Sequence, residues 1–469
     1  MSTTAQPTQT WNWTPQPRAF SLVQELVNTF LSSCRPAAKL AEQMKSAAGS
    51  RFIDWVDHVR IPHIMAHDLG LAGRMIDAGF NRVVMPGCDD CFVNDKGIFP
   101  NLLLSHERTL IVAIKVDSVA DFLGVWQVPA SNVVLGEPGA QMRMAQAFVS
   151  DEAELWVIER HGYRGYEIEA FDPKKAIAAM RHLENLCRRP RKGDDEVANF
   201  KSAMAIIDAS IQDIGRDWTC DLFFEAERRY WQRKNRAAQV QKARQDKLGL
   251  GWANHDHHTY RSSRENYTHL IAALEKLGFH CRERFYAGAE AGWGAQVLEQ
   301  PIAGITIFAD VDMSAEELMG DFAHAGLPPR EKLGTIGLWC ALHGEAFLQA
   351  GMHHLECMFD WHALKAQLES EAHIKTMDPF TTFPYLRQAF TEGERWPVEP
   401  RRVEALLAKH QITKKQADEF LKRGAVGSHL ENLERNDGFK GFNQHGVSQI
   451  ISKTDPRKLI EEELEKVGA

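Results

Sequence analysis

The stretch Trp252–Arg261 reads Trp-Ala-Asn-His-Asp-His-His-Thr-Tyr-Arg and gathers three histidines, one aspartate and one arginine. Side chains of a β-strand alternate between its two faces. As a strand, this stretch would place four side chains on one face: His255, His257, Thr259 and Arg261. Asp256, His258 and Tyr260 would lie on the other face. Imidazole is the commonest transition-metal ligand in proteins, so the stretch is a candidate for one half of a metal site.

A second histidine doublet lies further along the chain, in His353-His354-Leu355-Glu356. Two histidines and one carboxylate on one face would leave open positions on a metal for substrate and oxygen. We therefore interpret the two clusters as the two halves of one metal site. The competing interpretation is that each histidine is a structural residue held by hydrogen bonds.

Composition sets the broad class of the protein. The chain has 469 residues, of which 44% are hydrophobic and 25% charged, as expected for a globular protein of two to three domains. A net charge of -8 disfavours general nucleic-acid binding. No apolar run approaches the ~20 residues that a membrane helix needs. The polar N-terminus lacks a signal-peptide pattern, and eight scattered cysteines indicate reduced thiols, so we expect a cytoplasmic protein.

Four segments are predicted along the chain. They are a flexible tail over 1–18, an N-terminal α+β domain over 19–190, a helical connector over 196–250 and a metal-binding domain over 252–469. In the N-terminal domain, apolar and β-branched runs predict strands at 82–85, 110–116, 142–149, 154–160 and 163–171. Asp172 followed by Pro173 predicts the start of a helix.

The metal-binding domain begins with the order β-α-β-β-β. Strands are predicted at 254–261, 280–287, 293–299 and 304–310. Ser262 with Glu265 forms a capping-box pattern for the helix, which Gly278 would end. A second unit opens at 352–359, with Asp360 as the cap of its helix. Residues 384–425 are interpreted as a helical insertion, and 439–452 as a return to strand.

Within this order the chain resembles the 2-oxoadipate dioxygenase/decarboxylase (hydroxyglutarate synthase) family, which belongs to the vicinal oxygen chelate superfamily. That family is iron(II)-dependent and carries a His-x-x-x-Arg strand, which His257-His258-Thr259-Tyr260-Arg261 matches. The resemblance implies that His257 binds iron and that Arg261 receives a substrate carboxylate. His354 matches the family's second iron histidine. The implied fold is α+β, with vicinal oxygen chelate-like β-α-β-β-β modules, helical insertions and an N-terminal α+β domain.

The third ligand stays open, because Gly441 stands where the family has a glutamate. Glu299, at the end of a predicted strand, is the preferred replacement. The alternatives are Glu356, His445 and His255. We expect Arg261 and His258 to be the catalytic residues.

Three functions are compatible with these observations. The first is a mononuclear iron(II) dioxygenase that acts on a small carboxylate-bearing substrate, with zinc or manganese as alternative metals. The second is a metal-dependent hydrolase, because His255-x-His257 at a strand end also opens amidohydrolase-type barrels. The third is a non-catalytic scaffold or binding protein. The expected partner is a small molecule, with no membrane or general nucleic-acid contact, and a homo-oligomer is compatible with the sequence.

Overall fold

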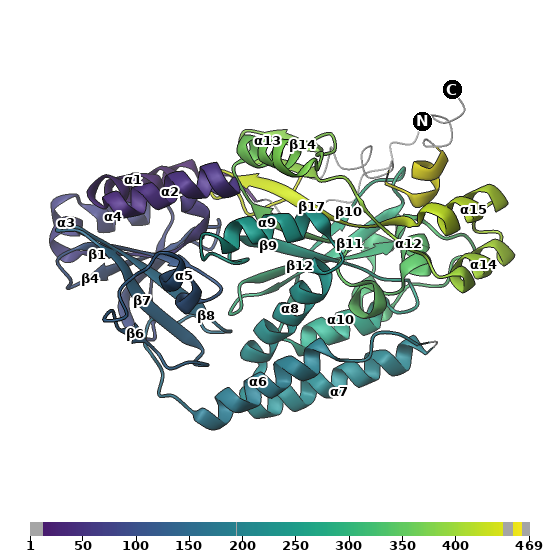
Figure 1. The fold of residues 1–469 in the computed structure, drawn as a ribbon, viewed down its shortest axis with the longest axis horizontal. Helices are drawn as coiled ribbons and strands as arrows, with labels where there is room; N and C mark the ends of the chain where they lie inside the picture. Colours follow the sequence, from purple (N-terminus) through teal and green to yellow (C-terminus); the bar gives the residue numbers. More distant parts are fainter. Residues whose placement is uncertain (1–12, 194, 444–453, 462–469) are drawn as a thin grey trace.

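Two mixed β-sheets organise the chain in the computed structural model, which describes residues 13–193, 195–443 and 454–461 (Figure 1). The first sheet has eight strands and the second has nine. A layer of helices runs along one side of the second sheet in Figure 1. No helix in the described ranges combines the length and apolar character that crossing a membrane requires.

The first sheet has the strand order β2-β3-β4-β1-β5-β8-β7-β6. Its strands are β1 (Val56–Pro62), β2 (Asn81–Met85), β3 (Cys88–Val93), β4 (Asn101–Ser105), β5 (Leu110–Lys115), β6 (Val134–Leu135), β7 (Met142–Val149) and β8 (Ala153–Arg160). The helices of this region are α1 (Pro17–Ser33), α2 (Arg35–Ala48), α3 (His63–Asp68), α4 (Leu71–Asp77) and α5 (Val119–Val125), with the short turn η1 (Phe52–Trp55). The strand predicted at 163–171 does not form.

The order of the first sheet divides it into two β-α-β-β-β units. In each unit the first strand pairs in parallel with the last, as β1 does with β4 and β5 with β8. The two first strands, β1 and β5, pair antiparallel and join the units at the centre of the sheet. The predicted N-terminal α+β domain is therefore itself a pair of these units, which its sequence pattern did not indicate.

Four helices follow the first sheet: α6 (Pro173–Cys187), α7 (Glu196–Ile214), α8 (Arg216–Gln232) and α9 (Arg236–Asp246). Asp172 caps α6 as predicted, because its carboxylate accepts hydrogen bonds from the backbone N–H groups of Lys174 and Lys175. The helices α6, α7 and α8 pack together beneath the second sheet (Figure 1). They cover the face of the sheet opposite the histidine cluster described below.

The second sheet repeats the topology of the first. Its strands are β9 (His255–Arg261), β10 (His280–Tyr286), β11 (Trp293–Gln300), β12 (Ile305–Asp312), β13 (His354–Met358), β14 (Thr381–Phe383), β15 (Leu386–Phe390), β16 (Glu394–Trp396) and β17 (Ala425–Arg435). The order is β10-β11-β12-β9-β13-β17-β15-β14, with β16 paired to β17. The first strands β9 and β13 again pair antiparallel at the centre.

This topology gives an α+β fold of vicinal oxygen chelate-like β-α-β-β-β modules with helical insertions. The helices of the second half are α10 (Tyr267–Lys276), α11 (Phe322–Ala325), α12 (Thr335–His343), α13 (Trp361–Ala372), α14 (Pro400–Ala408) and α15 (Lys414–Arg423), with the short turns η2 (Glu317–Met319) and η3 (Ala346–Ala350). The strands of this sheet do not alternate one by one with helices. The barrel that supported the hydrolase interpretation is therefore not the fold of these residues.

Several local predictions in the second half need correction. The helix α10 starts at Tyr267, and Ser262 donates a hydrogen bond to Glu345 at 2.8 Å instead of capping it. The segment read as a helical insertion contains β15 and β16 as well as α14 and α15. The strand that completes the second unit is β17 rather than 439–452, and residues 444–452 lie outside the described part of the chain.

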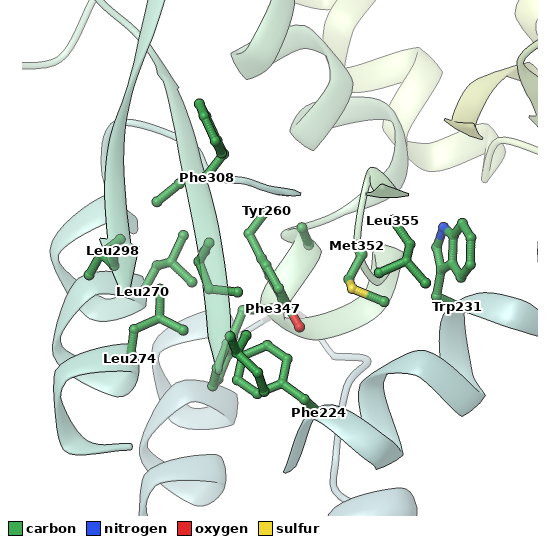
Figure 2. Packing of buried hydrophobic residues seen from close by; sticks show 14 of the residues in the cluster. Phe224, Trp231, Tyr260, Leu270, Leu274, Leu298, Phe308, Phe347, Met352 and Leu355 are labelled. Carbon is green, nitrogen blue, oxygen red and sulfur yellow. The ribbon is translucent and has the colours of Figure 1, made fainter. Parts of the chain in front are cut away.

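The core of the second half lies between the sheet and the helices. Figure 2 shows Tyr260, Phe224 and Phe347 within this cluster of buried residues. The carboxylate of Glu227, on α8, accepts a 2.9 Å hydrogen bond from the Tyr260 hydroxyl. It also pairs with Arg189 at 2.9 Å and contacts Arg191. Glu227 is 1% exposed, so this buried network fastens β9 to the helical layer.

The first prediction concerns this network. Replacing Glu227 with Gln leaves two buried guanidinium groups without a charge partner, which should lower the free energy of unfolding by about 3–5 kcal/mol. Glu225→Gln is the matched control, since Glu225 pairs with Arg229 near the surface of the same helix and should cost less than about 1 kcal/mol. Denaturant unfolding measures both. Equal losses in the two variants would contradict the anchoring role.

Candidate metal centre

Three neighbouring strands bring four ionisable side chains together at the centre of the second sheet. His257 on β9 lies directly opposite Glu356 on β13, and Glu356 lies opposite Glu431 on β17. His354 stands two residues before Glu356 and therefore on the same face of β13. The ligand atoms of these four residues all lie within 4.8 Å of one another, and all four residues are buried.

The contacts within this group, which we call the His/Glu cluster, centre on the Glu356 carboxyl. Its Oε1 lies 3.0 Å from His354 Nε2 and also contacts His257 Nε2. The Oε2 atom of Glu431 lies 3.5 Å from His354 Nε2. Two imidazole Nε2 atoms and two carboxylates thus converge on one point.

A β-bulge orients His257. His255 lies opposite Cys357 and His257 lies opposite Glu356, so Asp256 is an extra residue in β9 without a partner on β13. Its side chain therefore does not follow the regular alternation of the strand. Its carboxylate accepts a 2.7 Å hydrogen bond from His257 Nδ1 and is itself held by the Arg435 guanidinium at 2.8 and 3.1 Å. A carboxylate on Nδ1 fixes the ring orientation and turns Nε2 toward the cluster, as second partners of metal-bound histidines do.

Glu431 is oriented in the same manner by a neighbouring strand. The side-chain amide of Gln388, on β15, donates a 3.1 Å hydrogen bond to Glu431 Oε1. The other oxygen, Oε2, is buried and has no hydrogen-bond partner among the described residues. One oxygen is therefore fixed by Gln388, and the other lies 3.5 Å from His354 Nε2 without a hydrogen bond.

Burial decides the protonation of the cluster. It lowers the pKa of His257 to about 4, against the opposing effect of Asp256, so the imidazole is neutral at pH 7. Burial also raises the pKa of Glu431 to about 8. The pKa of Glu356 is raised well above its ordinary value by burial and by the neighbouring Glu431. Without a cation, two adjacent buried carboxylates cannot both be ionised.

These observations fit a divalent metal ion. Unpartnered oxygens remain on both Glu356 and Glu431, although buried polar atoms are normally satisfied. A cation would satisfy them and would stabilise the ionised carboxylates. Two neutral imidazoles with a carboxylate form the donor set typical of non-haem iron, and the same nitrogen and oxygen donors also suit manganese and zinc.

A narrow cavity opens onto the cluster. Its free volume is about 60 Å³, so it admits only a small molecule unless side chains move. Six of its fourteen lining residues are large aromatic side chains: Phe285, Trp293, Phe308, Phe380, Phe390 and Phe442. Thr259 and Asp310 also line the cavity. Arg261 lies directly opposite Asp310 in the pairing of β9 with β12 and shares its face of the sheet.

The structure brings together His257, His354 and Glu356, three of the residues selected from the sequence, and it does not bring Glu299 to them. The Glu299 carboxylate pairs instead with Lys440 at 3.2 Å and with Arg282 at 3.4 Å. Glu299 lies opposite Thr306 of β12, which in turn lies opposite His257, so a whole strand separates Glu299 from His257. Lys440 and Arg282 already balance its charge.

Two further candidates also lie away from the cluster. His258 points to the opposite face, where its ring lies 5.2 Å from that of Phe224. His255 lies 5.2 Å from the His258 ring because the bulge breaks the alternation that would have placed it beside His257. His445 lies outside the described residues.

Sequence reasoning missed Glu431. The segment Ser428-His-Leu-Glu-Asn-Leu-Glu-Arg435 spaces its leucines three residues apart and is rich in charge, which suits a helix better than a strand. The available signal was His429-x-Glu431, whose alternation repeats that of His354-x-Glu356. In the structure the two pairs lie side by side on parallel strands.

The first sheet contains a counterpart of the His257 environment. A bulge at the same place in the β1–β5 pairing lets Asp57 accept a 2.7 Å hydrogen bond from His58 Nδ1. Arg160, near the end of β8, holds Asp57 through two 2.9 Å bonds, as Arg435 holds Asp256. The positions of His354, Glu356 and Glu431 are taken in register by Ile111, Ala113 and Trp156. This half keeps the orienting contacts without the cluster.

Solved structures show a weak likeness to the chain. Methylmalonyl-CoA epimerase from Mycobacterium tuberculosis matches at 12% identity and a TM-score of 0.23, covering 39% of this chain and 88% of the epimerase. A mutant of 4-hydroxymandelate synthase from Streptomyces coelicolor matches at 13% identity and a TM-score of 0.25, covering 74% and 96%. A xylose isomerase-like TIM barrel/4-hydroxyphenylpyruvate dioxygenase fusion protein matches at 10% identity and a TM-score of 0.21, covering 96% and 58%. No protein-family model and no curated protein matches. Values this low assign no activity.

The second prediction tests the metal ligands. His257→Ala, His354→Ala and Glu431→Ala should each abolish metal binding, because each removes a donor from a small ligand set. Two variants serve as controls: Glu299→Ala, which removes the carboxylate preferred from the sequence, and His269→Ala, on α10. Metal content is measured by elemental analysis of the purified proteins. Loss of metal in Glu299→Ala, or retention in Glu431→Ala, would reverse the assignment.

The third prediction tests the orienting contacts. Asp256→Asn should weaken metal affinity by about ten- to a hundredfold, because it removes the charge that fixes His257. Asp57→Asn breaks the equivalent contact in the first sheet and should leave metal affinity unchanged, although it removes a similar buried carboxylate. Competition with a chelator of known affinity measures both variants. Equal effects on metal affinity would assign Asp256 a purely structural role.

Proposed function

We propose that this chain is a mononuclear non-haem iron(II) oxygenase that acts on a small carboxylate-bearing substrate, either a 2-oxo acid or an amino acid. The observation that carries the proposal is the convergence of His257, His354 and Glu431 from three adjacent strands on one end of a small aromatic cavity. Glu356 stands beside them as a second carboxylate. Two histidines and one carboxylate leave positions open for substrate and oxygen.

The other side chains support this chemistry by position and charge. Bound iron(II) supplies the capacity to activate dioxygen. His257 is neutral and holds its Nδ1 proton toward Asp256, so Nε2 remains available as a ligand. The aromatic walls make the surroundings of the cluster apolar, which strengthens charge interactions within it.

Arg261 is proposed to hold the substrate carboxylate. It is 4% exposed, and its Nε has no hydrogen-bond partner among the described residues. It lies four residues beyond His257 on the same face of β9, about 13 Å along the strand at ~3.3 Å per residue. Burying a guanidinium group costs free energy unless hydrogen bonds to an anion compensate. The planar guanidinium can donate two parallel hydrogen bonds to a carboxylate, so a substrate carboxylate would supply this compensation.

The test of the proposal combines two measurements on the purified protein. Metal analysis should find iron, and oxygen consumption should rise with a member of a panel of 2-oxo acids and amino acids. Zinc together with oxygen-independent hydrolysis would support the hydrolase alternative. A protein that holds no metal and gains no stability from added metal would support the non-catalytic alternative.

The fourth prediction concerns Arg261. Arg261→Lys should raise KM or lower kcat for the active substrate, with a combined loss in kcat/KM of about 2 kcal/mol, roughly thirtyfold, because the ammonium group makes no bidentate contact. Metal content should be unchanged, which separates substrate binding from metal binding. Turnover equal to that of the wild type would mean that Arg261 is structural.

A further inference from the structure

An acidic and a basic side chain, Asp310 and Arg261, lie directly opposite each other on β12 and β9, and the acidic one lines the cavity. Asp310 lines the cavity, is 2% exposed and carries a buried Oδ1 with no hydrogen-bond partner among the described residues. Arg261 is its direct neighbour on β9, yet no hydrogen bond joins the two side chains. Arg261 Nε and Asp310 Oδ1 are thus both buried without a hydrogen-bond partner among the described residues.

Such an arrangement is costly unless a ligand completes it. A buried carboxylate oxygen without a donor loses its hydration and gains nothing in return. Burial raises the pKa of Asp310 to about 8, while Arg261 opposes the increase. Burial likewise lowers the pKa of Arg261 to about 10. Two buried carboxylates outside the His/Glu cluster are satisfied: Asp312 accepts N–H bonds at the start of α12, and Glu345 accepts bonds from Ser262 and Ser263.

We infer that Asp310 and Arg261 together bind the zwitterionic end of an α-amino acid, with the ammonium at Asp310 and the carboxylate at Arg261. This inference rests on the proposed function, and it narrows the substrate from carboxylates in general to amino acids. An α-amino acid carries its two opposite charges on one carbon, and the protein offers two opposite charges on neighbouring residues of adjacent strands. The other end of the ligand then faces the His/Glu cluster.

A substrate with a carboxylate alone fits the site less well. Its charge would satisfy Arg261 but would leave Asp310 buried beside a second negative group. Hydrogen bonds to charged groups are strong, and a site built to receive such a donor discriminates against the analogue that lacks it. Asp310 is therefore assigned as the residue that selects for the ammonium group.

The experiment compares three pairs of ligands that differ only in the ammonium group: L-aspartate with succinate, L-glutamate with glutarate, and L-2-aminoadipate with adipate. Binding to the full-length protein is measured by calorimetry under nitrogen, so that no oxygen is consumed. In at least one pair the wild type should bind the amino acid about tenfold more tightly or better. Asp310→Asn should reduce that preference to within about threefold, because the amino acid binds more weakly and the dicarboxylate binds as tightly as before or more tightly.

Two further variants complete the design. Arg261→Lys should weaken both members of a pair equally, because both present a carboxylate. Asp310→Ser replaces Asp310→Asn if the latter does not fold or if its amide preserves the preference. The inference is overturned if the dicarboxylates bind as tightly as the amino acids, if no member of any pair binds, or if neither Asp310 variant changes the preference.

Metal content and oxygen consumption, measured on the same preparation, separate this inference from the proposed function. If the preference depends on Asp310 in a protein that holds no metal, the inference stands and the oxygenase proposal fails. If the protein holds iron and consumes oxygen but does not favour the amino acids, the oxygenase proposal stands and the inference fails.

Discussion

The antiparallel pairing of β9 with β13, bulged at Asp256, is the constraint on which the site depends. It sets His257 opposite Glu356 and, through the parallel pairing of β13 with β17, brings Glu431 into the same row. A shift of one residue in either pairing would place the side chains of one strand on the opposite face from those of its neighbour and would separate the cluster. In a regular strand the side chains of Asp256 and His257 would point to opposite faces. The bulge instead turns the Asp256 carboxylate toward the His257 ring. Position and orientation of the ligands thus follow from backbone pairing.

The interior of the second sheet concentrates groups that a folded protein would normally avoid burying. Two carboxylates lie together in the cavity wall, Asp310 also lines the cavity, and Arg261 lies opposite Asp310 on the neighbouring strand. Asp310 Oδ1 and Arg261 Nε have no hydrogen-bond partner among the described residues. The buried network around Glu227 and the aromatic core beneath the sheet hold β9 in place despite this cost. The stabilising contacts and the unsatisfied polar groups thus lie in different parts of this half of the chain. Functional sites commonly contain groups that cost stability until a ligand binds, while the surrounding structure compensates for that cost.

The sequence predicted the local features whose signals are short and strong. Residue type and spacing predicted the strand with His257, the doublet with His354, the β-α-β-β-β order and the caps at Asp172 and Asp360. The structure confirms each of them as local structure. The capping box at Ser262 failed because Glu345, distant in sequence, competes for its hydroxyl. Glu431 was missed because the pairing of β17 with β13 overrides a helix-like pattern. The fold of the first sheet was missed because its apolar strands carry no ligands to mark them.

The matching bulges in the two sheets indicate how the two halves of the chain are related in evolution. Each half carries an arginine, an aspartate and a histidine joined in the same order, at the same place in the same strand pairing. Such correspondence at matching positions is the expected trace of an internal gene duplication. Because Ile111, Ala113 and Trp156 stand where the second half has His354, Glu356 and Glu431, the shared trio persists in the first half without the His/Glu cluster. The trio therefore belongs to the architecture that the two halves share, and the His/Glu cluster distinguishes one half from the other.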